Sequence, residues 1–154
     1  MFAEIRRKER AMDPKQAREV LEKGGYGILS MCGQNGYGYG IPLNYVLEEN
    51  HLYFHCAVEG EKLRSIQKNN SVSFCVVGKA QVIAEEFTTN YESIIAFGKA
   101  DLSLTDDEII HAMRLLLKKY SPEHVELGEK YINQALKRIQ VIRVDIEHIS
   151  GKFH

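Results

Sequence analysis

The sequence predicts a mainly β protein with peripheral helices, built as an antiparallel barrel or sandwich. Between residues 26 and 55, segments with strand patterning follow one another with only short turns between them. Strands and helices do not alternate regularly, so a parallel doubly wound sheet is not expected. The 154 residues, 44% of them hydrophobic, suffice for one core, and we expect a single domain over residues 1–154.

The first predicted element is a helix that follows a charged N-terminal segment. Asp13 can cap this helix, Pro14 suits its first position, and Gln16 occupies the capping-box position. The pair Gly24-Gly25 is expected to end it, because glycine interrupts a helix readily.

Three strands are then predicted as an antiparallel meander. They cover residues 26–32, 37–47 and 51–55. Pro42 removes one hydrogen-bond donor from the second strand, so it marks an edge, a bulge or a position that faces a ligand. Glycine and tyrosine alternate just before it, over residues 36–40. Two interpretations stay open for that stretch: the close approach of a flat ligand, or a flexible hairpin arm with packed tyrosines.

The remaining elements are strands and helices in mixed order. A helix is predicted over residues 60–69. Strand patterning covers residues 71–77, 80–87, 91–104 and 142–147.

Two further helices are predicted between the last two of these strands. Thr105 and Glu108 form a capping box, in which each side chain should bond the other residue's backbone N–H. A second cap at Ser121, followed by Pro122, is expected to begin more helix that runs in pieces to about Arg138.

Composition excludes several classes of partner. The net charge of −1 gives no electrostatic reason to expect nucleic acid or an anionic membrane. No apolar run approaches the ~18 residues of a membrane span, and no secretory h-region begins the chain. The three cysteines are widely spaced, which fits reduced thiols better than a disulfide framework. We therefore expect a cytoplasmic protein without membrane or nucleic-acid partners.

The histidines and cysteines do not predict a metal site or a nucleophile. His51 and His55 would share one face of a strand but lie ~13 Å apart, too far to bind one metal. His55 and Cys56 are neighbours on a strand, so their side chains should point to opposite faces. We expect no metal, and we assign no catalytic residue.

The segment from residue 55 to residue 62 is a candidate phosphate site. It joins a strand to a helix, and Gly60 allows an anion close to the backbone N–H groups of the helix start. Lys62 in the first helical turn opposes the helix dipole, which is understandable if an anion lies between them. The alternative is that Lys62 is solvated and paired with Glu59 or Glu61.

The order of five segments resembles the pyridoxamine-phosphate-oxidase-like flavin split barrels, and within them the 5-nitroimidazole-resistance (Nim-type) group. The segments are Arg6-Arg7-Lys8, Ile41-Pro42-Leu43-Asn44-Tyr45, Leu52-Tyr53-Phe54-His55-Cys56-Ala57 with Gly60 and Lys62, Tyr91 to Gly98, and Val141 to Lys152. The third is the most specific, and the likeness spans nearly the whole chain.

The resemblance implies a six-stranded antiparallel split β-barrel that binds FMN and forms a homodimer with flavin at the interface. FMN would lie against the strand at residues 42–45, with its phosphate end near residues 55–62. The implied cofactor-binding residues are Pro42, Leu43, Asn44, Tyr45, His55, Ala57, Lys62, Tyr91 and Ser93.

The implied activity is that of an FMN-dependent oxidoreductase. It would act on a small molecule, with NAD(P)H as electron donor, and in the Nim-type group the substrate is a nitroimidazole. The chain lacks the Arg-rich pattern of a true pyridoxamine phosphate oxidase, so vitamin B6 oxidation is not expected. Related barrels bind haem or deazaflavin, and His55 could be an axial haem ligand. The alternative is therefore a non-catalytic flavin- or haem-binding protein, because a fold alone does not choose an activity.

Overall fold

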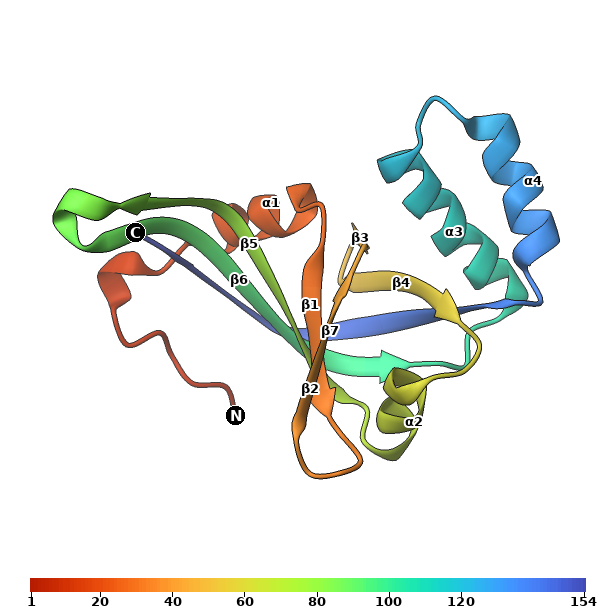
Figure 1. Cartoon of the computed structure of the whole chain (residues 1–154), viewed down its shortest axis with the longest axis horizontal. Coiled ribbons are helices and arrows are strands. Elements are labelled where there is room, and N and C mark those ends of the chain that lie inside the picture. The colour runs from red at the N-terminus through yellow and green to blue at the C-terminus, as the bar shows by residue number, and fades with distance from the viewer.

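Seven strands form one antiparallel sheet in the computed structural model, which describes residues 1–154. The strands are β1 (Gly27–Cys32), β2 (Gly38–Leu43), β3 (Val46–Glu48), β4 (His51–Ala57), β5 (Ser71–Ile83), β6 (Thr88–Asp101) and β7 (Ile139–Phe153). The helices are α1 (Pro14–Lys23), α2 (Glu61–Lys68), α3 (Asp106–Tyr120) and α4 (Val125–Ala135), with 3₁₀ turns η1 (Lys8–Arg10) and η2 (Ala84–Glu86). The helices lie around the sheet, which confirms the predicted class (Figure 1). No helix is both long and apolar enough to cross a membrane.

The two edges of the sheet are consecutive in the chain. The strand order is β2-β1-β5-β6-β7-β4-β3, so β2 and β3 are the edge strands. Only Asn44 and Tyr45 separate them in sequence. The pairing with β1 ends where β2 ends, and after two residues the chain pairs with β4 as β3. This direct connection brings the two edges of the curved sheet together. This is an antiparallel split barrel whose edges are not joined by hydrogen bonds. It has seven strands instead of the six expected, because a break at residues 44–45 divides the predicted strand 37–47.

Aromatic side chains fill the inside of the barrel. Tyr45, Phe54 and Phe74 have no exposed surface. The Phe74 ring lies edge-on to both others, with ring centroids 4.7 Å from Tyr45 and 4.9 Å from Phe54. Burial of each such side chain contributes roughly 1.5–3 kcal/mol. The two ends of the sheet, β2–β1 and β4–β3, are therefore packed against one shared core.

Helix α1 begins with the capping box that the sequence predicts. The Asp13 carboxylate accepts the Gln16 N–H at 2.9 Å, and the Gln16 side chain accepts the Asp13 N–H at 3.2 Å. The helix buries Ala17 and Leu21 against the sheet.

Removal of the Asp13 cap has a defined expected cost. Asp13→Ala should lower the free energy of unfolding by about 1 kcal/mol, because the Gln16 N–H loses its acceptor. Asp13→Asn keeps a side-chain oxygen and should retain most of that stability. Urea unfolding of the wild type and both variants measures the difference. Equal unfolding midpoints for the wild type and Asp13→Ala would show that the cap contributes nothing to stability.

Helices α3 and α4 form a hairpin between β6 and β7, with its own apolar cluster. Thr105 caps α3 as predicted, accepting the Glu108 N–H at 3.2 Å. The reciprocal half of the predicted capping box is absent, because the Glu108 carboxylate binds Arg143 of β7 and the Tyr53 hydroxyl instead. The prediction that Ser121 caps the next helix is wrong: residues 121–124 form a turn, and α4 begins at Val125.

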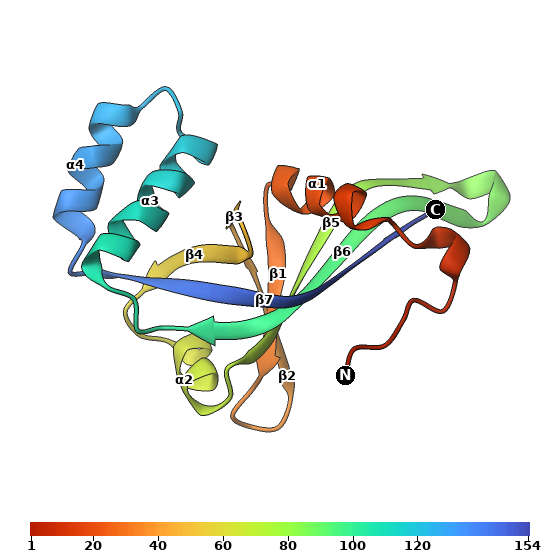
Figure 2. The ribbon, with the colours of Figure 1, turned by 180° about the vertical axis from the view of Figure 1, so that it is seen from behind.

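A long β-hairpin lies at the opposite end of the molecule. Strand β5 continues past a bulge between Val77 and Ala80 to Ile83, so the predicted segments 71–77 and 80–87 are largely one strand. Figures 1 and 2 show the β5–β6 hairpin at one end and the α3–α4 hairpin at the other. The N-terminal segment returns to the sheet beside β7, where the Phe2 ring stacks on His148 with centroids 4.8 Å apart.

Candidate functional site

Strands β2 and β4 diverge from the break at residues 44–45. Strand β4 pairs with β3 only from His51 to Tyr53, whereas it pairs with β7 as far as Ala57. Strand β2 pairs with β1 alone. The second half of β4 and the whole of β2 thus each have one edge without a partner strand. Backbone N–H and C=O groups on such edges are available to a ligand. We call the space between these two edges the split.

The side chains along the split alternate between the core and the solvent. Pro42 and Asn44 are exposed on the β2 side, and His55 and Ala57 are exposed on the β4 side. Leu43 is half-buried and packs against the core. The structure therefore brings two of the predicted groups of site residues to the two sides of one opening.

Tyr45 differs from the expectation that it contacts the cofactor. Its ring lies in the core, and its hydroxyl donates to the Leu21 carbonyl. Its backbone N–H donates to the Tyr120 hydroxyl at 3.0 Å, and its carbonyl accepts from Lys119 Nζ at 2.9 Å. With all of these groups used within the protein, Tyr45 has none free for a ligand, and residues 42–44 form the available part of this strand.

The start of α2 has the features of an anion site. Gly60 precedes the helix with φ of 144°, and no side chain caps the first N–H groups. Lys62 is half-buried and forms no ion pair. The alternative of a pair with Glu59 or Glu61 is not observed: Lys62 lies within ion-pair distance of neither, and the Glu61 carboxylate binds Gln34, Arg64 and Ser65. An uncompensated cation therefore lies at the positive end of a helix.

His55 and Cys56 are directed to opposite faces, as predicted. His55 reaches the solvent, but surrounding protein atoms partly desolvate it and lower its pKa. Cys56 packs against the core, where burial raises the pKa of its thiol, and the positive charge of Lys62 acts in the opposite direction. At neutral pH, His55 is therefore a neutral imidazole that can donate one hydrogen bond.

Tyr91 and Ser93 do not join the residues of the split within one chain. They lie on β6, which is separated from β2 by β1 and β5. Ser93 pairs with Val77 on one side and with Lys152 on the other. The structure thus separates the predicted site residues into two groups on one sheet.

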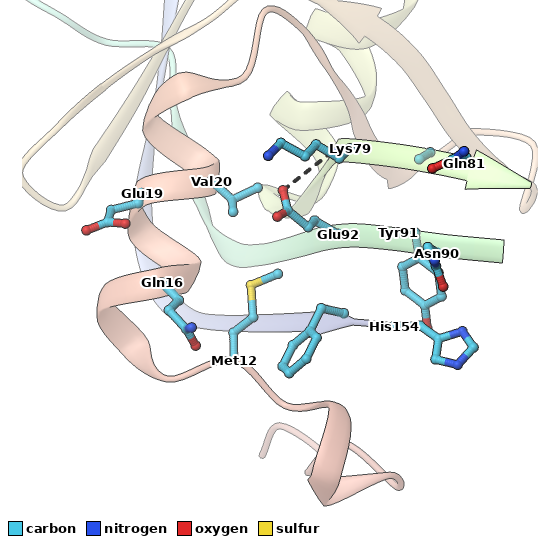
Figure 3. Close-up of a pocket in the computed structure, with 12 residues that line it drawn as sticks. Met12, Gln16, Glu19, Val20, Lys79, Gln81, Asn90, Tyr91, Glu92 and His154 are labelled. Atoms are coloured by element: carbon cyan, nitrogen blue, oxygen red, sulfur yellow. Dashed lines mark hydrogen bonds between the residues drawn. The ribbon is translucent and has the colours of Figure 1, made fainter.

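Tyr91 lines a cavity of about 740 Å³ between α1, the β5–β6 hairpin and the end of β7. Figure 3 shows the Glu92 carboxylate directed toward the Lys79 backbone N–H, at 3.4 Å, on the inner wall of this cavity. Lys152, and to a smaller extent Arg10, lower the pKa of the Tyr91 hydroxyl by stabilising its anion. Tyr91 therefore presents a polar, positively flanked group near the solvent.

Two residues beside the split are not predicted by any sequence pattern. Lys119 and Tyr120 reach Tyr45 from the last turn of α3, across a separation of 74 and 75 residues. Nothing in their local sequence distinguishes them from other polar residues on a surface helix.

The sequence profile described as pyridoxamine 5'-phosphate oxidase matches residues 13–153. The chain belongs to this family. The match includes both sides of the split, the start of α2 and the whole of β6. No curated protein matches the sequence.

Solved structures with the same fold include proteins that bind different cofactors. A candidate 5-nitroimidazole antibiotic resistance protein from Bacteroides thetaiotaomicron has a TM-score of 0.79 and 21% identity, over 92% of this chain and 85% of that one. The flavocytochrome Anf3 from Azotobacter vinelandii has a TM-score of 0.83 and 17% identity, over 98% and 72%. An FAD-binding protein from Mesorhizobium loti has a TM-score of 0.68 and 22% identity, over 94% and 97%. At these identities the likeness establishes the fold of this family member.

Proposed function

We propose that this chain is an FMN-dependent oxidoreductase that binds the cofactor along the split. The observation that carries the proposal is Lys62, a half-buried cation without an ion pair at the uncapped start of α2. A phosphate there would be held by the Lys62 ammonium and by the free N–H groups of the helix. Ala57 and His55 lie on the adjoining unpaired edge of β4, where the imidazole can donate a further hydrogen bond.

The strand on the other side of the split suits the flat ring of the cofactor. Gly38 and Gly40 have no side chains, and an added Cβ at Gly38 would meet nothing within 4 Å. Pro42 and Asn44 continue the same outward row. Residues 42–44 would meet the ring edge through their backbone, and the cofactor, when bound, would supply hydride transfer while the protein positions it.

The proposal includes a homodimer, because Tyr91 and Ser93 are remote from the split of their own chain. The outer face of the sheet carries exposed apolar side chains, among them Ile28 at 37%, Ile95 at 38% and Val77 at 57%. Ile28 and Ile95 lie in one row, with Cys75 between them. A face of this kind is typical of a surface that another protein covers. A second copy placed there would add its own Tyr91 and Ser93 to the flavin site.

The substrate would be a small molecule that accepts electrons from the reduced cofactor, with NAD(P)H as donor. The fold shared with the candidate 5-nitroimidazole resistance protein supports nitroimidazoles as the first substrates to test. We propose no side chain as the acid or base of the reaction.

The proposed function is tested by adding FMN to purified protein. Stoichiometric uptake should quench flavin fluorescence and shift the flavin absorption bands, with one FMN per chain. NAD(P)H should then bleach those bands, and a nitroimidazole should restore them. Absence of flavin uptake by the folded protein would contradict the proposal.

A second candidate function is a non-catalytic protein that carries flavin or haem. The relatives that favour it are the flavocytochrome Anf3 and an FAD- and haem-binding protein from Mycobacterium smegmatis, which share the fold. In that case His55, exposed on β4, is the candidate axial ligand. A Soret band after addition of haem, lost in His55→Ala, would support this function, and bound flavin that NAD(P)H does not reduce would support a carrier role.

A further inference from the structure

The last turn of α3 replaces a missing strand partner at the break between β2 and β3. At Tyr45 the chain has left β1 and has not yet paired with β4. A residue at such a position has a backbone N–H and a C=O without partners, which is costly when they are buried. The Tyr120 hydroxyl accepts the Tyr45 N–H and also lies 3.0 Å from the Tyr45 carbonyl.

A second carbonyl lies within reach of the same hydroxyl. Tyr120 Oη is 2.7 Å from the Gly25 carbonyl oxygen, and the Asn44 amide donates to that same oxygen at 3.0 Å. A hydroxyl has one proton, so Tyr120 can donate to only one carbonyl at a time. Lys119 resolves this shortage, because its Nζ donates to the Tyr45 carbonyl at 2.9 Å. We call these five residues, Gly25, Asn44, Tyr45, Lys119 and Tyr120, the junction.

Lys119 is held at the junction by more than one contact. Its ammonium lies 3.9 Å from the centre of the Tyr45 ring and 5.3 Å from that of Tyr120, a geometry typical of cation–π contacts. Partial burial lowers its pKa to about 8, and Glu22 opposes that shift. At neutral pH the amine is therefore largely protonated, with donors for both the carbonyl and the ring.

We infer that Lys119 and Tyr120 are positioning residues, which fix the backbone of residues 42–44 against the flavin ring through the junction. The inference rests on the proposed function. Two sets of hydrogen bonds support it. The Asn44 side-chain amide donates to the Gly25 carbonyl, and the backbone N–H and C=O of Tyr45 bond to Tyr120 and Lys119. These bonds hold the C-terminal end of residues 42–44, which follow the edge of β2 that has no partner strand. The α3–α4 hairpin thereby sets the geometry of one side of the split.

The test compares Tyr120→Phe with Tyr131→Phe. Both variants remove one phenol hydroxyl from the hairpin, but Tyr131 lies on α4, half exposed, and makes no hydrogen bond through that hydroxyl. We expect Tyr120→Phe to raise the Kd for FMN about three- to tenfold. It should also shift the absorption spectrum of the bound flavin at saturation. Tyr131→Phe should change neither. If Tyr120→Phe does not fold, Lys119→Met against the exposed neighbour Lys118→Met makes the same comparison.

The outcomes separate this inference from the proposed function. A wild-type protein that takes up no FMN overturns the proposed function and this inference with it. Wild-type protein and Tyr120→Phe that bind FMN with equal Kd and equal saturated spectra overturn this inference alone. A lowered unfolding temperature of apo Tyr120→Phe with unchanged FMN binding also overturns this inference alone, because the junction would then contribute only to stability.

Discussion

Replacing Lys62 by glutamate is expected to abolish FMN binding while the barrel remains folded. The change places an anion where the phosphate is proposed to lie, beside the uncapped N–H groups of α2. Lys62→Ala removes the charge-assisted contact without adding repulsion, and should cost about 1.5–3 kcal/mol of binding, or roughly 10- to 150-fold in Kd. Fluorescence titration with FMN measures both variants.

The matched control is Lys68→Glu, in the last turn of the same helix. A glutamate in the first turn interacts favourably with the helix dipole, whereas a glutamate in the last turn opposes it. Lys62→Glu should therefore leave α2 as stable as before but lose FMN. Lys68→Glu should weaken α2 slightly and retain FMN. Unchanged affinity in Lys62→Glu would exclude Lys62 as a phosphate ligand, whatever the stability of the helix.

The second large effect is expected from Arg143→Ala, which should destabilise the protein by about 3 kcal/mol. The Arg143 guanidinium lies 2.8 Å from Glu108 Oε2, 2.8 Å from Asp145 Oδ1 and 3.1 Å from Asp101 Oδ2. Its side chain is 21% exposed, so solvent screens these contacts only in part. Truncation leaves three carboxylates close together without the Arg143 guanidinium, and the start of α3 then keeps only the Tyr53–Glu108 hydrogen bond of the two polar contacts that join Glu108 to the barrel.

Arg114→Ala is the control for this prediction. Arg114 pairs with Glu129 at 2.8 Å, but the two side chains are 59% and 41% exposed. An exposed pair of this kind contributes little to stability, because solvent screens the two charges. Urea unfolding should therefore separate the two alanine variants clearly, and equal losses would show that the position of Arg143 is not special.

The pH dependence gives a second test of the same network. Hydrogen bonds from Arg143, and then from Tyr53, hold the pKa of Glu108 below its ordinary value of 4.5. A carboxyl with a lowered pKa stabilises the folded state above its unfolded pKa, and that contribution is lost as the pH falls through the folded value. The stability gap between wild type and Arg143→Ala should therefore be largest near pH 7 and narrow below about pH 4. A gap that is equal at pH 7 and pH 3 would contradict this assignment.

Local signals in the sequence predicted much of the fold. The Asp13 cap depends only on residues three positions apart, and the turn at Gly60 depends on its lack of a Cβ. Pro42 was predicted to mark an edge, a bulge or a ligand-facing position, and it lies on an edge strand. Features of this kind depend only on residues close together in the chain, so they can be predicted from the sequence.

Contacts between distant segments could not be predicted in the same way. Glu108 fits a capping box, but Arg143, 35 residues away, is a stronger partner for its carboxylate than a backbone N–H. Tyr45 stands in a motif that suggests a ligand contact, yet its own backbone is paired with a helix 75 residues further on. Two of the residue groups that the resemblance implies as flavin contacts, 42–45 and 55–62, lie at the ends of the two strands that border the split. The resemblance did not reveal that Tyr91 and Ser93 lie elsewhere on the sheet of the same chain.

The unpaired edge of β2 also bears on solubility. An open strand edge is a template on which another chain can add a strand, and such addition leads to aggregates. Three of the six residues of β2 are glycine or proline, and Pro42 cannot donate a backbone hydrogen bond to an incoming strand. These residues therefore disfavour strand addition at the open edge of β2, which keeps the ligand-free protein from polymerising there.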